Sequence, residues 1–248
     1  MRGYVFAILG AIGVTLAFLY LFGGSADIAP PAALLLPRPH AYGSSSESLA
    51  DIHITALYFV PHDMVPISRE EWMIPLEQEL RRLQEFHTVQ FRGSSRVTYA
   101  LQAVPIMGEK PRSAYDIDAG GHTDPEILRP VMDEAARGVG RSLDAGSPYE
   151  VLLVLYEGVG AGGAKHVALL SRSFFERSDT QLNVGTFLAH EFYHTLGIPD
   201  AYRTIPKVFS DGTTADVELL ESRDVMGRVR LPLEESYIEP VTLTAMGL

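Results

Sequence analysis

The sequence predicts an α/β fold with a mixed sheet, and three observations lead to this prediction. A continuous apolar run at Tyr149–Tyr156 is typical of a central strand that is covered on both faces. Segments rich in β-branched and aromatic residues alternate along the chain with segments of helical periodicity. The chain has 248 residues, of which 46% are apolar and 21% are charged, so it can bury a large core.

The N-terminal residues 1–22 predict a membrane segment. Tyr4–Phe22 contains no charged residue, and as a helix it would span roughly 28 Å, close to the thickness of the hydrocarbon core of a bilayer. Arg2 precedes this run, which favours a cytoplasmic N-terminus and an extracytoplasmic C-terminal domain. We therefore expect a single-pass signal-anchor. A cleaved signal peptide, cut near Gly24–Ala26 and giving a secreted protein, is the alternative, and a buried core helix is less favoured.

Residues 23–50 are rich in proline, glycine and serine and predict a linker, which places the globular domain at 51–248. Within this domain, hydrophobic patterning predicts strands at Asp51–Val60, Val97–Met107, Tyr149–Tyr156 and Lys165–Ser171. Helical periodicity predicts helices at Ser68–Phe86, Pro125–Val139, Thr180–Leu196 and, at the end of the chain, Glu239–Gly247.

Local signals mark the ends of several of these elements. The helices at Ser68 and Thr180 each begin with a capping box, in which Ser68 pairs with Glu71 and Ser178 with Gln181. The stretch Gly158–Gly163 is rich in glycine and predicts a turn between two strands.

Composition excludes several classes of protein. The 20 Lys and Arg residues against 31 Asp and Glu residues give a formal net charge of −11. Binding to nucleic acid needs a dense basic surface, so no nucleic-acid partner is expected. The chain has no cysteine, which excludes disulfides, thiolate zinc sites and cysteine nucleophiles.

The predicted helix Thr180–Leu196 carries His190, Glu191 and His194. Histidines four residues apart share one helix face, so both imidazoles can reach one ion. Neutral imidazole suits zinc, and a catalytic zinc takes three protein ligands and keeps one position open. Glu191 lies about 100° around the helix from His190, beside the ion, where its carboxylate can accept a proton from a zinc-bound water. The pattern therefore predicts a zinc hydrolase.

Gly197 and Asp200 extend this pattern. Gly197 can adopt a positive φ, which ends the helix and turns the chain sharply. Asp200 can then return beneath His190 and His194 as an oxygen ligand. We therefore expect one catalytic zinc ion held by His190, His194 and Asp200.

The segment His190–Asp200 resembles the zinc-binding signature of the metzincin metalloproteases, and an aspartate as third ligand resembles the snapalysin and immune-inhibitor-A type of site. The resemblance implies a metzincin-like fold with a mixed twisted sheet and a long active-site helix in an upper subdomain at 51–197, and a small lower subdomain at 198–248. Asp224–Gly227 is similar to the methionine turn of this family, with Met226 as the apolar floor beneath the metal.

The resemblance further implies a metalloendopeptidase that acts outside the cytoplasm on a protein or peptide, with Glu191 as general base. By analogy, Ala164–Ser171 would be the antiparallel edge strand that pairs with an extended substrate. Many relatives carry a tyrosine two residues after the methionine, where this chain has Arg228. Tyr202 or Tyr237 would then be the candidates for stabilising the oxyanion.

Two alternative functions remain open. A gluzincin arrangement would take its third ligand from Glu218 or Glu221, although Ala215–Ser222 is better interpreted as a surface helix. From a different class, the domain would be a membrane-tethered zinc-binding scaffold or an inactive peptidase-like binding module. Glu191 argues against this second alternative, because a purely structural zinc site has no use for a carboxylate at that position.

Other polar residues give weaker signals. A loop within Gly108–Asp124 could bind calcium, but it lacks the ligand spacing of an EF-hand, so a solvated loop is preferred. Its candidate ligands are Asp116, Asp118, His122 and Asp124. The acidic stretch Asp211–Asp216 is interpreted as solvated in the same way. The remaining histidines of the domain, His53, His62, His87 and His166, are interpreted as structural or exposed. His166 lies near the proposed edge strand and is a minor candidate for contacting substrate.

Overall fold

The computed structural model describes residues 37–115, 125–140, 148–177, 183–202, 204–218, 223–227 and 231–248. They belong to one compact unit that begins at Pro37. Within these ranges, no helix combines the length and apolar character needed to cross a bilayer. Several predictions fall outside the described residues: the membrane segment Tyr4–Phe22, the acidic loop residues Asp116–Asp124, the capping residues Ser178 and Gln181, and Glu221 and Arg228.

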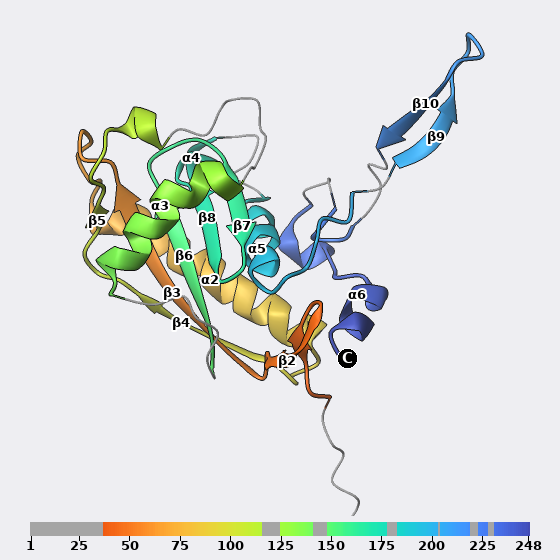
Figure 1. Cartoon of the computed structure of the whole chain (residues 1–248), viewed down its shortest axis with the longest axis horizontal. Helices are drawn as coiled ribbons and strands as arrows, with labels where there is room; N and C mark the ends of the chain where they lie inside the picture. The colour runs from red at the N-terminus through yellow and green to blue at the C-terminus, as the bar shows by residue number, and fades with distance from the viewer. Residues whose placement is uncertain are drawn as a thin grey trace, which may run out of the picture. The chain divides into compact units, whose positions relative to one another are not determined.

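A mixed sheet forms the centre of the unit (Figure 1). Its strands, in spatial order, are β4 (Arg96–Leu101), β3 (Asp51–Val60), β6 (Tyr149–Tyr156), β8 (Val167–Ser171) and β7 (Ala161–Ala164), and the short strand β5 (Ile106–Met107) pairs with the end of β3. Every pairing is parallel except that of β7 with β8. The α/β class and the mixed sheet are thus confirmed. The apolar run of β6 is a central strand, as predicted, and both of its neighbours are parallel to it.

Two strand predictions and one turn prediction differ from the structure. The stretch Val97–Met107 is divided into β4 and β5. The expected antiparallel edge strand at Ala164–Ser171 is wrong, because β8 pairs in parallel with β6 and lies inside the sheet. The edge is formed by β7, which occupies part of the predicted turn Gly158–Gly163. A tight turn at Lys165–His166 joins β7 antiparallel to β8, and this places β8 inside the sheet.

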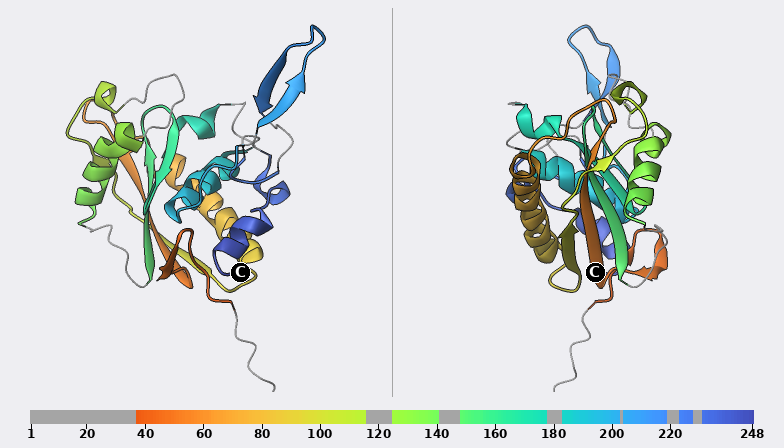
Figure 2. Two further views of the ribbon diagram at one scale, coloured as in Figure 1. Left: turned by 45° about the vertical axis from the view of Figure 1, so that its right-hand side comes forward. Right: turned by 90° about the vertical axis from the view of Figure 1, so that its left-hand side faces the viewer.

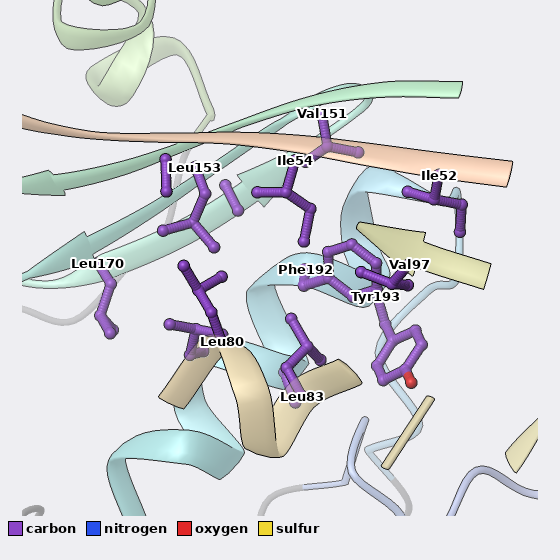
Figure 3. Close-up of a cluster of buried hydrophobic side chains, with 14 of the residues drawn as sticks. Ile52, Ile54, Leu80, Leu83, Val97, Val151, Leu153, Leu170, Phe192 and Tyr193 are labelled. Carbon is purple, nitrogen blue, oxygen red and sulfur yellow. The ribbon is translucent and has the colours of Figure 1, made fainter. Parts of the chain in front are cut away.

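Helices cover both faces of the sheet (Figure 2). Helices α2 (Arg69–Gln90) and α5 (Val184–Thr195) pack on one face, where side chains such as Ile54, Leu83 and Phe192 form the larger core cluster (Figure 3). Helix α3 (Pro125–Gly138) covers the other face over a second cluster. Successive residues of a strand point to opposite faces, so β3 supplies both clusters.

The capping prediction is confirmed for α2. Ser68 accepts a hydrogen bond from the backbone of Glu71, and the Glu71 carboxylate accepts one from the Ser68 backbone. Helix α5 is described from Val184, with Asn183 as its N-cap, and the predicted start at Thr180 lies outside the described residues. Among the described residues, the other helices are α4 (Ser173–Glu176), α6 (Pro240–Ala245) and the 3₁₀ turns Arg112–Ala114 and Leu233–Glu235.

The predicted linker 23–50 is too long, because residues 37–50 are part of the folded unit. They form the hairpin of β1 (His40–Ala41) and β2 (Ser44–Ser48), which we call the N-terminal hairpin segment. Leu49 is fully buried in the main core. The backbone of the segment donates hydrogen bonds to Leu196 O at the end of α5 and to Met246 O near the C-terminus.

A second hairpin contradicts the predicted surface helix at Ala215–Ser222. Strands β9 (Thr204–Val208) and β10 (Thr214–Glu218) pair antiparallel and project from the unit (Figure 1). Every side chain from Pro206 to Ala215 is exposed. The acidic stretch from Asp211 therefore lies at a solvated tip, where Asp211 accepts hydrogen bonds from Thr213.

His87 has a structural role, and it predicts an effect of pH on stability. Its ring is fully buried against Phe91, and burial lowers its pKa to about 3. In the unfolded state His87 takes up a proton near pH 6.5, whereas in the folded state it does so only near pH 3. The free energy of unfolding is therefore highest above pH 6.5 and falls as the pH drops towards 3. Between pH 7.5 and pH 5, the wild type should lose about 2 kcal/mol more unfolding free energy in denaturant titrations than His87→Gln. Equal losses would contradict this assignment.

Candidate metal centre

Helix α5 brings His190 and His194 together on one face, as the spacing predicts. Their Nε2 atoms lie 3.1 Å apart and their rings are nearly perpendicular, at 85°. The helix packs against β7 and β8 and is buried along most of its length, so both rings are held in a rigid element. His190 is almost fully buried, whereas His194 keeps 18% of its side chain exposed.

The chain turns sharply after α5 and brings Asp200 back to the two histidines. Gly197 has a φ of +86°, and its N–H donates to His194 O while the next N–H, of Ile198, donates to Tyr193 O. This pair of bonds is a Schellman motif, which ends a helix in a fixed direction. Asp200 Oδ1 then lies 3.2 Å from His190 Nε2 and 3.5 Å from His194 Nε2.

Backbone carbonyls orient both imidazoles. The Nδ1 atom of His190 is 2.9 Å from Val225 O, and that of His194 is 2.8 Å from Ile198 O. A carbonyl oxygen only accepts hydrogen bonds, so each Nδ1 carries the proton and each Nε2 presents a lone pair. Both lone pairs are therefore available at the point where Asp200 Oδ1 also converges.

This donor set fits a zinc ion. In a tetrahedral site with bonds of about 2.0–2.1 Å, the ligand atoms lie about 3.3 Å apart, close to the three separations at this centre. Two neutral imidazoles and one carboxylate are ligands that zinc commonly takes. The Asp200 side chain is 42% exposed, so a fourth position can be reached from solvent.

Glu191 is a second carboxylate at the same centre. Its oxygen and the imidazole nitrogens of His190 and His194 all lie within 4.8 Å of one another, so these three residues also form a metal-binding group by themselves. Asp200 fits better as the third ligand, because its Oδ1 lies within 3.5 Å of both nitrogens. Glu191 is buried beside the ligands, and this position suits a proton acceptor.

Electrostatic coupling within the cluster agrees with a cation-binding role. Partial burial pushes the pKa of Asp200 upward. When His190 and His194 are protonated, however, their Nε2–H groups donate to Asp200, which outweighs burial and holds its pKa below its ordinary value. Burial likewise opposes charge on His194, but Asp200 and the nearby charge of Glu191 raise its pKa. The carboxylates therefore favour positive charge at the centre.

The turn Asp224–Gly227 lies beside this cluster and accepts hydrogen bonds from His190 and from the backbone next to Asp200. Val225 O accepts the His190 hydrogen bond, and Met226 O accepts one from the backbone N–H of Ala201, which follows Asp200. The Met226 side chain is buried in the main core. Met226 can be identified from the sequence, whereas the Val225 and Ile198 carbonyls cannot, because any residue type can supply a carbonyl.

The edge strand β7 approaches α5 very closely at Gly163. A methyl group there would overlap the carbonyl oxygen of Glu191 and come within 2.6 Å of His194 Cβ. A strand with larger side chains could not pack at this distance. Gly163, one of the glycines that predicted a turn, thus allows the sheet edge to lie against α5.

The two tyrosines proposed for the oxyanion differ in their surroundings. The ring of Tyr202 is stacked parallel to His190, with centroids 6.3 Å apart. The contacts described for Tyr237 are made by its backbone, which pairs with Arg223 and Val225. Of the gluzincin candidates, Glu218 ends β10 in the projecting hairpin. His166 lies in the turn between β7 and β8 and packs on Tyr149.

No family model matches the chain, and a search among curated proteins finds no match either.

Proposed function

We propose that the protein is a zinc-dependent metalloendopeptidase of the metzincin type, with His190, His194 and Asp200 as zinc ligands and Glu191 as general base. The observation that carries the proposal is the convergence of two imidazole Nε2 atoms and one carboxylate oxygen, 3.1 to 3.5 Å apart, with a second carboxylate beside them. The predicted segment Tyr4–Phe22 would tether the enzyme to a membrane, with its domain outside the cytoplasm.

Each residue has a distinct task in this proposal. When bound, zinc supplies a Lewis acid that polarises the scissile carbonyl and lowers the pKa of water to about 7. Glu191 accepts the proton of the attacking water and passes it to the leaving amine. Tyr202 lies beside His190 and is the better placed of the two tyrosines to contact the oxyanion. An open edge at β7, next to α5, suits an extended peptide substrate.

The zinc content of the full-length protein tests this proposal directly. We expect one zinc per wild-type chain, and a loss or strong weakening of binding in His190→Ala and Asp200→Ala. Glu191→Ala should keep its zinc, because Glu191 is assigned as base rather than ligand. Glu218→Ala serves as a matched carboxylate control outside the centre and should also keep its zinc.

Other outcomes would redirect the interpretation. Zinc that persists in Asp200→Ala but is lost in Glu191→Ala would make Glu191 the third ligand and remove the proposed base. Zinc lost in Glu218→Ala instead would favour the gluzincin arrangement. A wild type that takes up no zinc under any loading would leave a tethered binding module as the better hypothesis.

A further inference from the structure

The peptide unit between Val225 and Met226 is held at both of its ends. Its C=O, belonging to Val225, accepts the Nδ1–H of His190 at 2.9 Å. Its N–H, belonging to Met226, donates to Asp224 Oδ1 at 2.8 Å. Because a peptide unit is planar and trans, its C=O and N–H point in opposite directions. Rotation of this plane would therefore break both hydrogen bonds together.

Asp224 is built into the surrounding structure. It is only 1% exposed, and its other oxygen, Oδ2, accepts a hydrogen bond from the backbone of Glu239 at 3.2 Å. The backbone on either side pairs with Tyr237, since Val225 donates to Tyr237 O and Tyr237 donates to Arg223 O. The carboxylate thus fixes the turn against the segment that opens α6.

We infer that Asp224 is a positioning residue for the metal centre, which acts on His190 through the Val225–Met226 peptide unit. This inference rests on the proposed zinc site and deepens it. In many metal sites, a carboxylate accepts the Nδ1–H of a ligand histidine directly, which fixes its tautomer and raises its basicity. In this chain, a peptide group stands between the carboxylate and the imidazole. Hydrogen bonds in series polarise one another, so the charge of Asp224 makes Val225 O a stronger acceptor.

The second ligand histidine lacks such an arrangement. His194 donates to Ile198 O, and the residue that follows Ile198 is Pro199, whose nitrogen carries no hydrogen. That peptide unit has no N–H for a carboxylate to accept. The influence of Asp224 is therefore specific to His190 and, through the bond from Ala201 N–H to Met226 O, to the backbone beside Asp200.

The affinity of the full-length protein for zinc tests this role, measured by competition with a chromophoric chelator well below the unfolding temperature. Asp224→Ala should weaken zinc binding by about 10–100-fold. Asp224→Asn keeps an acceptor oxygen but loses the charge, so its zinc affinity should lie between that of the wild type and that of Asp224→Ala. The absorption bands of the cobalt-loaded protein should also differ between the wild type and Asp224→Ala, since the His190 ring is no longer held.

Two control variants separate positioning from general stability. Asp211, in the exposed β9–β10 turn, accepts a hydrogen bond from the backbone N–H two residues ahead, as Asp224 does. Asp211→Ala should leave the zinc affinity unchanged. Val131→Ala destabilises the core on the far face of the sheet and should also leave it unchanged. A weakening in Val131→Ala equal to that in Asp224→Ala would overturn the inference.

The remaining outcomes are also decisive. Suppose that the wild type binds zinc and that both Asp224 variants keep its zinc affinity and its cobalt spectrum. That result would overturn this inference and leave the proposed function intact. If Asp224→Ala does not fold, Asp224→Asn carries the same test. Absence of zinc binding in the wild type would overturn both proposals.

Discussion

Glu191→Gln should abolish peptide hydrolysis while leaving zinc in place. The substitution preserves the size of the side chain but removes its negative charge and its ability to accept a proton. A general base contributes about 10²–10⁴-fold to such reactions, so kcat should fall by that factor. Zinc content should stay at one per chain, because His190, His194 and Asp200 supply the close ligand set. The measurement is cleavage of a quenched fluorescent peptide library, run beside metal analysis of the same samples.

Two comparisons sharpen this test. The Glu218→Gln variant makes the same chemical change in the projecting hairpin and should retain wild-type activity. Chelation of the wild type should remove hydrolysis, and zinc should restore it in the wild type but not in Glu191→Gln. If Glu191→Gln cleaves peptides as fast as the wild type, the assignment of the general base is wrong.

The features that the sequence predicted well are those set by local interactions. Apart from Glu150, the run Tyr149–Tyr156 is apolar on both faces, so it had to be covered on both sides, and β6 is a central strand. The Ser68 capping box and the glycine at 197 act within a few residues of their own position. The spacing of His190 and His194 depends only on helix geometry, and their Nε2 atoms indeed converge.

The features that the sequence did not predict depend on contacts between distant segments of the chain. Gly163 lies in a strand because β7 pairs with β8, and its missing side chain lets α5 approach closely. The residues next to Gly163 in the sequence indicate neither contact. The segment Thr214–Glu218 contains residues compatible with a helix, but pairing with β9 makes it a strand. The carbonyls that orient the two histidines belong to the backbone, so no residue type in the sequence indicates them. These hydrogen bonds to the imidazoles can be identified only in the folded structure.

Composition also misled the placement of the domain boundary. Serine, proline and glycine usually indicate a linker, but in the N-terminal hairpin segment a few apolar residues decide the outcome. Ala41 and Leu49 are buried in the main core, and Ser95 Oγ donates to Leu49 O. The segment also contacts the end of α5, since Tyr42 N–H donates to Leu196 O and a methyl group at Gly197 would come within 2.8 Å of Tyr42 O.

A chain that begins at Asp51 should therefore be far less stable than one that begins at Pro37. Truncating one buried leucine to alanine costs about 2–5 kcal/mol. Total stability is only about 5–15 kcal/mol, so the loss of Leu49 together with the backbone bonds of the segment is a large fraction of it. Denaturant titration of the two chains measures the difference directly, and Leu49→Ala in the longer chain isolates the share of that side chain.

The same truncation should weaken zinc binding, because the segment holds the end of α5 that leads to Asp200. Tyr42 N–H donates to Leu196 O, Gly197 packs on Tyr42, and the turn that follows brings Asp200, the proposed third ligand, to His190. Without this support, the turn loses its anchor while both histidines remain on the helix. Equal stability and equal zinc affinity in the two chains would show that residues 37–50 are a passive linker, as their composition suggests. A loss of both would make this segment part of the machinery that builds the metal centre.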